Sequence, residues 1–559
     1  MKIQLIDVLI IIAYFAGVIG LGLWIARRKI KGGEDFFLAS REMSWPMVGA
    51  SLFSTNISSQ QFVGQAGMAF TLGIVVGMFQ MIGAMCFAFL ALFFIEAYMG
   101  MRLRTSPEFF ERRYNRGCGA FVSAINVLSI VSANIAAALY SGATVMTELF
   151  GWADGPRANA LFWAAVVILG ATTGLYTVLG GLRSVIYTDF VQNWILVLGG
   201  AVTLIAGVAY LGGVEPLLSL RDAAGVSKWS LWRPWNHTLG WLPLLTGTVI
   251  LGVHGHCTDH DYVQRALSAK NLYHAKMGCL FASFLKVLAL FIITAPGVVA
   301  ARLFPDLQNG DRAYVRLLTT VMPAGLMGLC LAGLLAAIMS TVSSSLSAAS
   351  ALLTFDFFGR RRAPAGAHTA DAGNDAASVT MGRWIIVVVL ILCMAWAPSI
   401  RWFPGVYSYL INIWALTAPP VFVCVVFGTF YPRSTARGAV ATLIAGSILG
   451  AAMFVVINFG AAMGLPIQEW KAAGVGAYLF NALNACFIIT VICVTVMLVV
   501  SHATGASEED RAKGGVVSRS RRAETMSARE RAIYRVTLST LAALGVIVLI
   551  LFSPLGIGR

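Results

Sequence analysis

Charged residues are scarce in this 559-residue chain: they make up 12% of it, whereas hydrophobic residues make up 58%. Soluble domains are about 45–50% apolar and about 25% charged, so this composition cannot supply the polar shells of a soluble protein of the same length. The chain is therefore predicted to be an all-α polytopic membrane protein. Its net charge of +15 does not indicate nucleic-acid binding, because the Lys and Arg residues lie in short clusters between apolar segments, where they set membrane orientation.

Motifs of enzymes, metal centres and disulfide frameworks are also missing. None of the nine cysteines belongs to a CxxC pair, so they are interpreted as small buried hydrophobic residues. The sequence has no HExxH, GxSxG or P-loop motif and nothing that resembles a channel selectivity filter. We therefore expect neither an enzyme nor a cofactor. A sensor built on a transporter is disfavoured too, because the longest polar segment is too short for a signalling domain.

Apolar segments of about 20 residues, the length that crosses a membrane, recur along the chain. They begin near residues 5, 43, 72, 118, 159, 184, 239, 277, 320, 382, 404, 435, 477 and 535. This predicts about fourteen transmembrane helices, with a retained first helix and both termini on one side. Since the Arg-rich loops 27–41, 102–116, 360–383 and 511–535 fall on the other side, both termini are predicted to be extracytoplasmic. The excess of Arg over Lys indicates a bacterial inner membrane. Segments 363–378 and 507–525 are predicted to be solvated, unstructured linkers.

Two predicted spans are interrupted by polar residues. The second contains STNISSQQ at 54–61 and the seventh contains GVHGHCTD at 252–259. The two spans lie five helices apart, an odd number, so the halves that they open have opposite orientation. Paired interruptions of this kind indicate a midplane binding site in a secondary transporter. Two kinked helices that only pack against their neighbours are the alternative.

The interruptions predict inverted five-helix repeats with broken first helices, a LeuT-like core. The expected segments are a first helix with its loop (1–42), the first repeat (43–211), an extracytoplasmic loop (212–238), the second repeat (239–430), two more helices (431–505), a cytoplasmic linker (506–534) and a last helix (535–559).

Hydroxyl side chains share one face of the ninth predicted span, where Ser340, Ser343, Ser344 and Ser347 follow the i, i+3, i+4, i+7 spacing and Thr341 lies beside them. Such a stripe can serve helix packing. It also supplies the oxygens that a hard monovalent cation needs beside an unwound helix.

Asp189 and Lys286 are ionisable residues in or near predicted spans. A charge at the centre of a span costs about 2.5–3.5 kcal/mol, so each is expected to have a partner or a function. For Asp189, at the cytoplasmic start of the sixth span, the alternative to an ion site is an ion pair with Arg183. Lys286 needs a polar or acidic neighbour.

Segments 49–67, 177–192, 257–278 and 339–358 together resemble the sodium/solute symporter family, and within it the sodium–glucose cotransporter branch. The resemblance implies a sodium-coupled symporter that imports a small polar organic solute by alternating access. Its main sodium site would comprise the carbonyls of Ser54, Ile57 and Ala337 and the hydroxyls of Ser340 and Thr341. A second site, present in some members, would comprise Asp189, Ser340, Ser343 and Ser344.

The resemblance also implies a solute pocket between the broken spans. The polar positions Asn56, Gln61 and Lys286 of the sugar transporters are retained. Gln80 replaces an acidic residue, Gly255 replaces an aromatic gate between His254 and His256, and Ile411, next to Asn412, replaces a glutamine. These replacements argue against a simple hexose and tolerate an anionic solute better. The candidate solutes are a sugar, a polyol or a sugar acid; the alternatives are a monocarboxylate, an amino acid or a vitamin.

The histidines His254, His256 and His260 surround the second interruption. On a regular helix, His256 and His260 with Cys257 and Asp259 could hold a transition metal, but in a broken helix a pH-sensitive gate or solute contact is preferred. The expected partners are sodium ions, the solute and the lipid bilayer, with no nucleic acid. Proton coupling through Asp189 is the nearest alternative mechanism, and a channel is less favoured.

Overall fold

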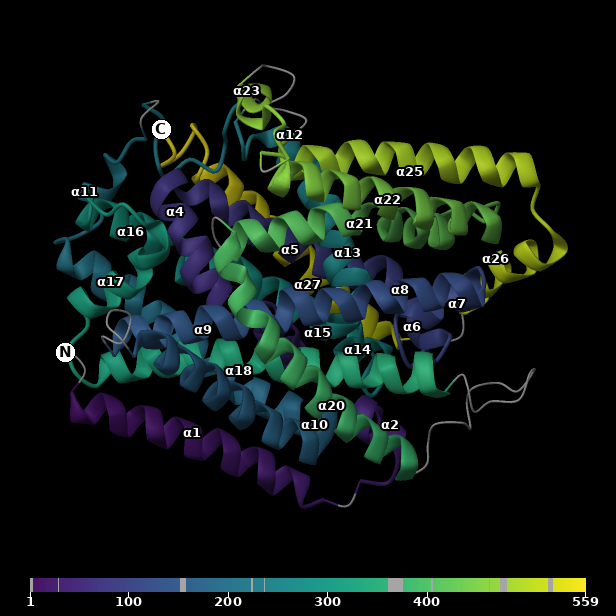
Figure 1. Ribbon diagram of the computed structural model, residues 1–559, viewed down its shortest axis with the longest axis horizontal. Coiled ribbons are helices and arrows are strands. Elements are labelled where there is room, and N and C mark those ends of the chain that lie inside the picture. Colours follow the sequence, from purple (N-terminus) through teal and green to yellow (C-terminus); the bar gives the residue numbers. More distant parts are fainter. Residues whose placement is uncertain are drawn as a thin grey trace.

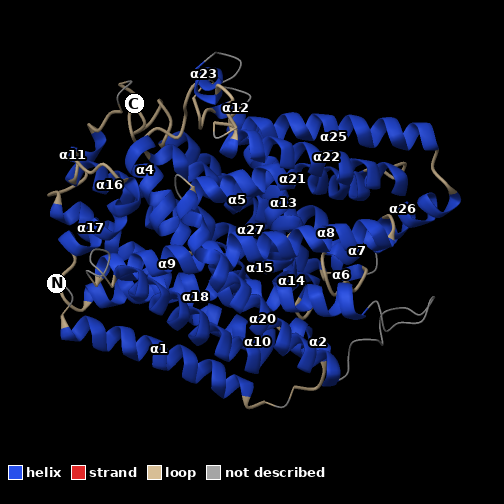
Figure 2. Cartoon of the chain, in the orientation of Figure 1, coloured by secondary structure: helices blue, strands red, loops and turns tan. Residues whose placement is uncertain are grey.

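The computed structural model describes residues 4–28, 30–150, 157–222, 225–235, 237–359, 376–403, 406–461, 463–472, 480–520 and 526–559. Throughout these ranges the regular elements are helices, with two isolated bridges and no strand (Figure 2). The predicted all-α fold is therefore confirmed. All nine cysteines are buried and free, as their apolar surroundings predict.

Eleven helices in the described ranges are long and apolar enough to cross a membrane (Figure 1). They are Leu5–Ala26 (α1), Ile74–Gly100 (around α5), Arg116–Leu149 (α8 and α9), Ala158–Tyr210 (α10), Leu272–Leu303 (α15 and α16), Leu326–Phe358 (around α18), Ala376–Trp402 (around α20), Tyr409–Phe430 (in α21), Ala436–Phe459 (α22), Ala482–Thr504 (α25) and Ala528–Leu551 (α27).

The predicted number of fourteen spans is not confirmed by this count. The fifth and sixth predicted spans form one element, α10, which has 53 residues and a kink at Gly181, where φ is 57°. Glycine tolerates this positive φ because it has no Cβ. The second and seventh predicted spans are each made of short helices, and neither span is among the eleven.

The first predicted interruption is present and short. Helix α3 (Trp45–Asn56) ends at Ile57, whose backbone is extended at φ −98° and ψ 116°. Helical structure resumes after Ser58, through a π-helical turn at Gln61–Gln65 (η2) and then α4 (Ala66–Leu72). The polar residues that follow the break form part of this second half of the span.

The second interruption is narrower than predicted. Residues 252–258 remain helical within α13 (Val249–Thr258), and only Asp259 leaves the helix, at φ −65° and ψ 131°. Asp259 then caps α14 (His260–Leu267), because its carboxylate accepts the N–H of Asp261 at 3.3 Å. Aspartate is a strong N-cap, so the break falls at this residue instead of along the Gly and His residues before it.

Helix α18 (Leu326–Leu352) is almost entirely buried and packs against α1, α3 and α10. Glycines bring α10 and α18 close together: a Cβ added at Gly333 would lie 3.1 Å from the carbonyl oxygen of Ile195, and one at Gly199 would lie 3.3 Å from the Cα of Cys330. Small residues permit such contact between membrane helices. The hydroxyl face of α18 is buried, and its side chains contact both α10 and the first interrupted span.

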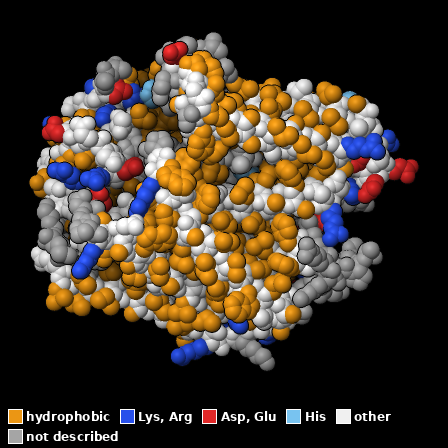
Figure 3. Space-filling model, viewed as in Figure 1, with side chains coloured by type: hydrophobic (Ala, Val, Ile, Leu, Met, Phe, Trp, Pro, Cys, Tyr) orange, Lys and Arg blue, Asp and Glu red, His pale blue; other side chains and the backbone are white. Residues whose placement is uncertain are grey.

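Apolar side chains dominate the visible surface, as expected for a protein in a lipid bilayer (Figure 3). In the most apolar stretches of α1 and α27, only 17% and 11% of the residues are buried. Both termini lie toward one end of the bundle, whereas α26 lies toward the other end (Figure 1). This arrangement agrees with an even number of crossings.

The prediction of an unstructured linker at 507–525 is wrong for residues 508–520, which form α26 (Glu508–Ser520). The helix is held by its neighbours: Lys513 Nζ donates to the carbonyl of Tyr114 at 2.7 Å, and Asp510 accepts the N–H of Ala436 at 3.0 Å. Residues 521–525 lie outside the described residues, as does most of the linker predicted at 363–378. The last helix begins at Ala528, earlier than predicted.

Candidate functional site

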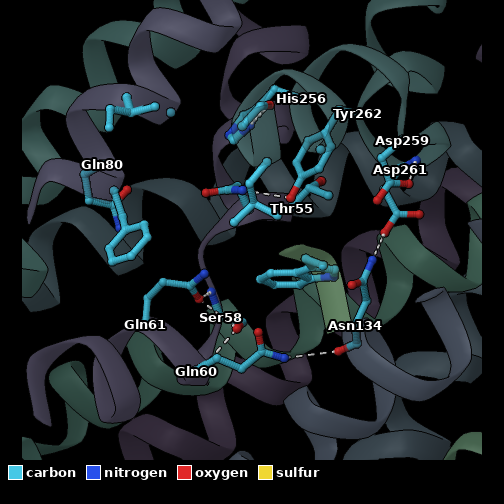
Figure 4. Close-up of a pocket in the computed structure, with 18 of the residues that line it drawn as sticks. Thr55, Ser58, Gln60, Gln61, Gln80, Asn134, His256, Asp259, Asp261 and Tyr262 are labelled. Atoms are coloured by element: carbon cyan, nitrogen blue, oxygen red, sulfur yellow. Dashed lines mark hydrogen bonds between the residues drawn. The ribbon is translucent and has the colours of Figure 1, made fainter. Parts of the chain in front are cut away.

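A cavity lies between the two interrupted spans (Figure 4). With its opening included, it encloses about 980 Å³ of space, within the size range of small-molecule sites. Its walls come from both sides of each break and from α5 (Met78–Phe89), α15 (Leu272–Ala289), α18 and α21 (Val406–Phe430). We call it the central cavity.

Eight of the nine residues predicted to contact a solute line the central cavity. They are Asn56, Gln61, Gln80, His254, Gly255, His256, Lys286 and Ile411. The ninth, Asn412, does not line it, because its amide donates to Asn458 Oδ1 at 3.1 Å. One residue along a helix turns a side chain by about 100°, so Ile411 and Asn412 face different neighbours.

Lys286 has the polar neighbour that its burial requires. Its ammonium group donates to Gln80 Oε1 at 2.8 Å, and Gln80 Nε2 donates to Gln65 Oε1 at 2.6 Å. The lysine is 4% exposed. A Cβ added at Gly83 would lie 3.2 Å from Lys286 Nζ and 3.3 Å from His256 Nε2, so both groups border the same part of the cavity. This end of the cavity presents the lysine amino group.

Tyr262 joins the two interrupted spans across the cavity, which the sequence did not indicate. The amide of Asn56, at the end of α3, donates to the Tyr262 hydroxyl at 2.8 Å. The Tyr262 ring stacks on His256, with centroids 5.3 Å apart and planes 16° apart. An aromatic side chain thus covers this part of the cavity, although Gly255 has none and a Cβ added there would meet no atom within 4 Å.

The opposite part of the cavity is acidic, and it too was missed. Asp259 and Asp261 both line it. Asp261 Oδ2 accepts the amide of Asn134 at 3.0 Å and a short hydrogen bond from the Ser345 hydroxyl. Gln60 Nε2 donates to the carbonyl of Asn134 at 3.3 Å (Figure 4). The acidic residues in 257–261 were visible in the sequence, but the direction in which their side chains point depends on the residue at which the helix breaks.

The carboxylate of Asp189 is fully buried and surrounded by hydroxyl groups. It accepts hydrogen bonds from Ser340 at 2.7 Å, Ser51 at 2.5 Å and Ser344 at 3.4 Å. The fourth predicted member of this group, Ser343, donates instead to the carbonyl of Ser340 at 3.0 Å. The structure therefore brings Asp189, Ser340 and Ser344 together and adds Ser51, which the sequence did not indicate.

The alternative ion pair between Asp189 and Arg183 is wrong. Arg183 Nη2 lies 2.7 Å from a carboxylate oxygen of Glu42 and 3.6 Å from one of Asp35. Six residues along a helix correspond to about 240°, so Arg183 and Asp189 face different sides of α10.

The first break releases two carbonyl groups that a regular helix would use. The N–H of Ser58, which would bond to Ser54, donates to Gln61 Oε1 at 2.8 Å. The N–H of Gln61, which would bond to Ile57, donates to the carbonyl of Ser58 at 3.1 Å. The carbonyls of Ser54 and Ile57 are thereby withdrawn from the i to i+4 ladder and remain available as ligands.

Thr341 connects the hydroxyl face of α18 to this break. Its hydroxyl donates to the carbonyl of Thr55 at 3.3 Å, and its side chain also lines the central cavity. Thr55 Oγ1 lies 2.8 Å from Ser344 Oγ. Ala337 lies one turn before Thr341 on α18 and is fully buried. The predicted main-site residues thus lie on two segments that are in contact.

The three histidines have separate partners. His254 Nδ1 lies 2.9 Å from the Thr258 hydroxyl, and His256 Nδ1 lies 2.9 Å from the Gly252 carbonyl. His260 Nδ1 accepts the N–H of Ser106 at 3.3 Å. Within the described part of the chain, no group of three His, Cys, Asp or Glu side chains could hold a metal ion. His254 and His256 contribute to the wall of the cavity, whereas His260 faces another loop.

Comparison with known proteins gives consistent relatives. The family model of the sodium:solute symporter family matches residues 36–446. The chain is 32% identical to sodium/glucose cotransporter 2 of Rattus norvegicus over 80% of this chain and 71% of that protein. It is 32% identical to sodium/myo-inositol cotransporter 2 of Mus musculus over 79% and 69%. The solved structure of a Na⁺-coupled sialic acid symporter in a substrate-bound outward-open state has the same fold, with a TM-score of 0.73, 18% identity and coverage of 89% of this chain and 98% of that one.

Proposed function

Because this chain belongs to the sodium:solute symporter family, and is therefore a membrane-embedded, sodium-coupled symporter of a small polar organic solute, we propose that the central cavity is its solute site. The observation that carries this proposal is the position of Thr341, which borders the cavity and donates to the carbonyl of Thr55 at the first break. One residue thus touches both the solute site and the sodium site that we propose there.

We place the main sodium ion between the first break and α18. Its ligands would be the carbonyls of Ser54, Ile57 and Ala337 and the hydroxyls of Ser340 and Thr341. The two carbonyls released by the break support this assignment, because neutral oxygens replace the hydration shell of a hard cation.

A second sodium ion is proposed at Asp189, with Ser340, Ser343 and Ser344. The burial of Asp189 among three hydroxyl donors supports it, because a carboxylate in a span requires a partner or an ion. For the ion to bind there, the hydroxyl hydrogens would turn away from the carboxylate and present their oxygens. Hydroxyl groups can do this without moving their heavy atoms.

The solute is proposed to be a sugar or polyol, whose several hydroxyl groups donate hydrogen bonds. Asn56 Oδ1, Asn134 Oδ1 and Asp261 Oδ1 are buried acceptors without a partner among the described residues, and all three side chains line the cavity. Solute hydroxyls would satisfy such acceptors, whereas a monocarboxylate brings only acceptors of its own. Lys286 could donate to a hydroxyl oxygen or an acid group of the solute, so a sugar acid also fits. The names of the sugar and myo-inositol relatives agree with this class.

Transport is proposed to follow alternating access, with the repeats at 43–211 and 239–430 moving against each other around the fixed site. Sodium would bind first and stabilise the first interrupted span against α18. The Arg-rich loops support a cytoplasmic position for the end that carries α26, with both termini extracytoplasmic in a bacterial inner membrane.

A thermal-shift screen of the purified protein tests the proposal. Hexoses, myo-inositol, sialic acid, monocarboxylates, amino acids and vitamins would each be tested in sodium and in potassium. We expect a polyhydroxylated solute to raise Tm in sodium only. Stabilisation that ignores the cation would contradict the sodium sites, and stabilisation by a monocarboxylate alone would contradict the solute class.

A further inference from the structure

The buried arginine Arg265 has no role in the sites described so far. It lies in α14, directly after the second break, and its side chain is fully buried. Its Nη1 group donates to the carbonyl of Asp261 in a short hydrogen bond and to Gln264 Oε1 at 3.4 Å. Its Nε and Nη2 groups have no hydrogen-bond partner among the described residues. A buried guanidinium with unused donors is costly unless opposite charges compensate it.

The acidic groups nearest in effect to this guanidinium belong to both proposed sites. The guanidinium of Arg265 interacts electrostatically with Asp189 and also with Asp261 and Asp259. Asp189 belongs to the proposed second sodium site, whereas Asp261 and Asp259 line the central cavity. Arg265 itself does not line the cavity, so it faces neither the solute nor bulk water. Its charge acts on the carboxylates of two sites, although among the described residues none of them forms a direct ion pair with it.

Two adjacent serines of α18 make a second connection between the same carboxylates. Ser344 donates to Asp189 Oδ2 at 3.4 Å, and Ser345 donates to Asp261 Oδ2. Asp261 also holds the amide of Asn134, another residue of the cavity wall. A change at Asp189 can therefore reach the cavity through one rigid helix as well as through Arg265.

We propose that Arg265 is the coupling residue of this symporter: sodium at Asp189 neutralises that carboxylate and leaves the guanidinium to pair with Asp261, which fixes the acidic wall of the solute cavity. Asp261 Oδ1 has no partner among the described residues, and its two lone pairs can accept from the guanidinium and from a solute hydroxyl together. Without sodium, Arg265 is divided between the two sites and the wall is held less firmly. The inference depends on the proposed sodium and solute sites. The inference names the residue through which sodium changes the affinity for the solute. By reciprocity, the solute changes the affinity for sodium by the same factor.

The test compares full-length wild-type protein with Arg265→Gln. The dissociation constants of myo-inositol and glucose are measured in saturating sodium and in potassium, and that of sodium is measured with and without each solute. Couplings between sites are typically about 5–150-fold. We expect the sodium-to-potassium ratio of solute affinity to be at least about tenfold in the wild type and below about twofold in Arg265→Gln. Sodium itself should bind the variant at least as tightly, because a competing cation is gone.

Arg113→Gln is the matched control. Arg113 is also fully buried, but its guanidinium donates to the carbonyls of Gly428 and Ser434, away from both sites. This variant should lose thermal stability and keep the wild-type ratio. An unchanged ratio in Arg265→Gln, or an equal loss in Arg113→Gln, would overturn the role of Arg265.

A second pair of variants covers the case in which Arg265→Gln does not fold. Ser345→Ala removes the hydroxyl that holds Asp261 and should lower the ratio, whereas Ser347→Ala, on the same helix, should leave it unchanged. Equal ratios in the two serine variants would overturn the coupling path. If no solute bound the wild type in a sodium-dependent way, the proposed function itself would fail. If the wild type and Arg265→Gln both bound solute with the same sodium dependence, only the role of Arg265 would fail.

Discussion

Asn56 and Tyr262 hold the two interrupted spans together by a hydrogen bond of 2.8 Å from the amide to the phenol oxygen. Asn56 is the last residue of α3 and Tyr262 belongs to α14, so the bond joins one segment from each of the two predicted repeats. Both side chains line the central cavity. A movement that separates the two broken spans has to break this hydrogen bond.

Tyr262→Phe should weaken solute binding and leave sodium binding nearly unchanged. The substitution keeps the ring that stacks on His256 but removes the acceptor of the Asn56 amide. A hydrogen bond of this kind contributes about 0.5–1.5 kcal/mol, so the Kd of the solute should rise by up to about tenfold. Isothermal titration of the solute in sodium gives the Kd of the solute, and titration of sodium without solute gives the Kd of sodium. Tyr314→Phe, which removes a hydroxyl near Thr203 outside the cavity, is the control; equal effects of the two variants would refute a specific role for Tyr262.

Thr341→Ala should weaken sodium dependence while the protein still folds. The variant removes one proposed ligand oxygen and the hydrogen bond to the Thr55 carbonyl. We expect the sodium concentration for half-maximal solute binding to rise by about tenfold, the equivalent of about 1.4 kcal/mol. Thr341→Ser keeps the hydroxyl and should restore the wild-type value. If Thr341→Ala has wild-type sodium affinity, Thr341 does not belong to the site.

Asp189→Asn tests the second sodium ion. With two coupled ions, the Hill coefficient for sodium in solute uptake should approach two in the wild type and fall toward one in the variant, because the asparagine keeps the shape and loses the charge. Uptake into proteoliposomes at graded sodium concentrations gives the coefficient. A value near two in the variant would argue against an ion at Asp189. Uptake that persists in potassium and rises in acid would favour proton coupling instead.

Much of this architecture could be predicted because its causes are local in the sequence. Each apolar run has the length of one crossing, and the polar stretch around Ile57 cannot continue a helix without freeing carbonyls. The hydroxyl stripe that includes Ser340 and Ser344 follows helical spacing, so its common face was visible before any neighbour was known. The partner of that face was not visible, because it depends on how α18 packs against α3 and α10.

The residues that were missed depend on the exact end of a helix. The second break lies at Asp259 alone and not along 252–259, so His254 and His256 stay on a helix while Asp261, Tyr262 and Arg265 turn inward on the next one. A shift of a few residues in a helix end redirects every side chain after it. The pairing of Asp189 with hydroxyl groups instead of Arg183 has the same origin, since it depends on the rotation of α10.

Asp510→Asn should destabilise the protein at neutral pH. Burial alone would raise the pKa of Asp510, but hydrogen bonds from Ala436 and Ser507 and the charge of Arg113 lower it below its ordinary value. A carboxylate with a lowered pKa stabilises the fold above its unfolded-state pKa of about 3.9, and this stabilisation is lost as the pH falls through the folded-state value. The difference in Tm between wild type and variant should therefore be present at pH 7 and shrink below about pH 4. A difference that does not change with pH would exclude the charge as its cause.

Lys286→Ala should impair solute binding more than sodium binding. The amino group donates to Gln80 Oε1 and borders the cavity beside His256, so its loss removes a donor to the solute and leaves Gln80 Oε1 without its donor. Hydrogen bonds to a charged group contribute about 1.5–3 kcal/mol, so solute affinity should fall by more than tenfold, whereas sodium affinity without solute should change little. Lys276→Ala is the matched control, because Lys276 lies on the same helix and pairs with Glu96 at 3.3 Å, away from the cavity. A larger loss of sodium affinity than of solute affinity in Lys286→Ala, or equal losses of solute affinity in both variants, would exclude Lys286 from the solute site.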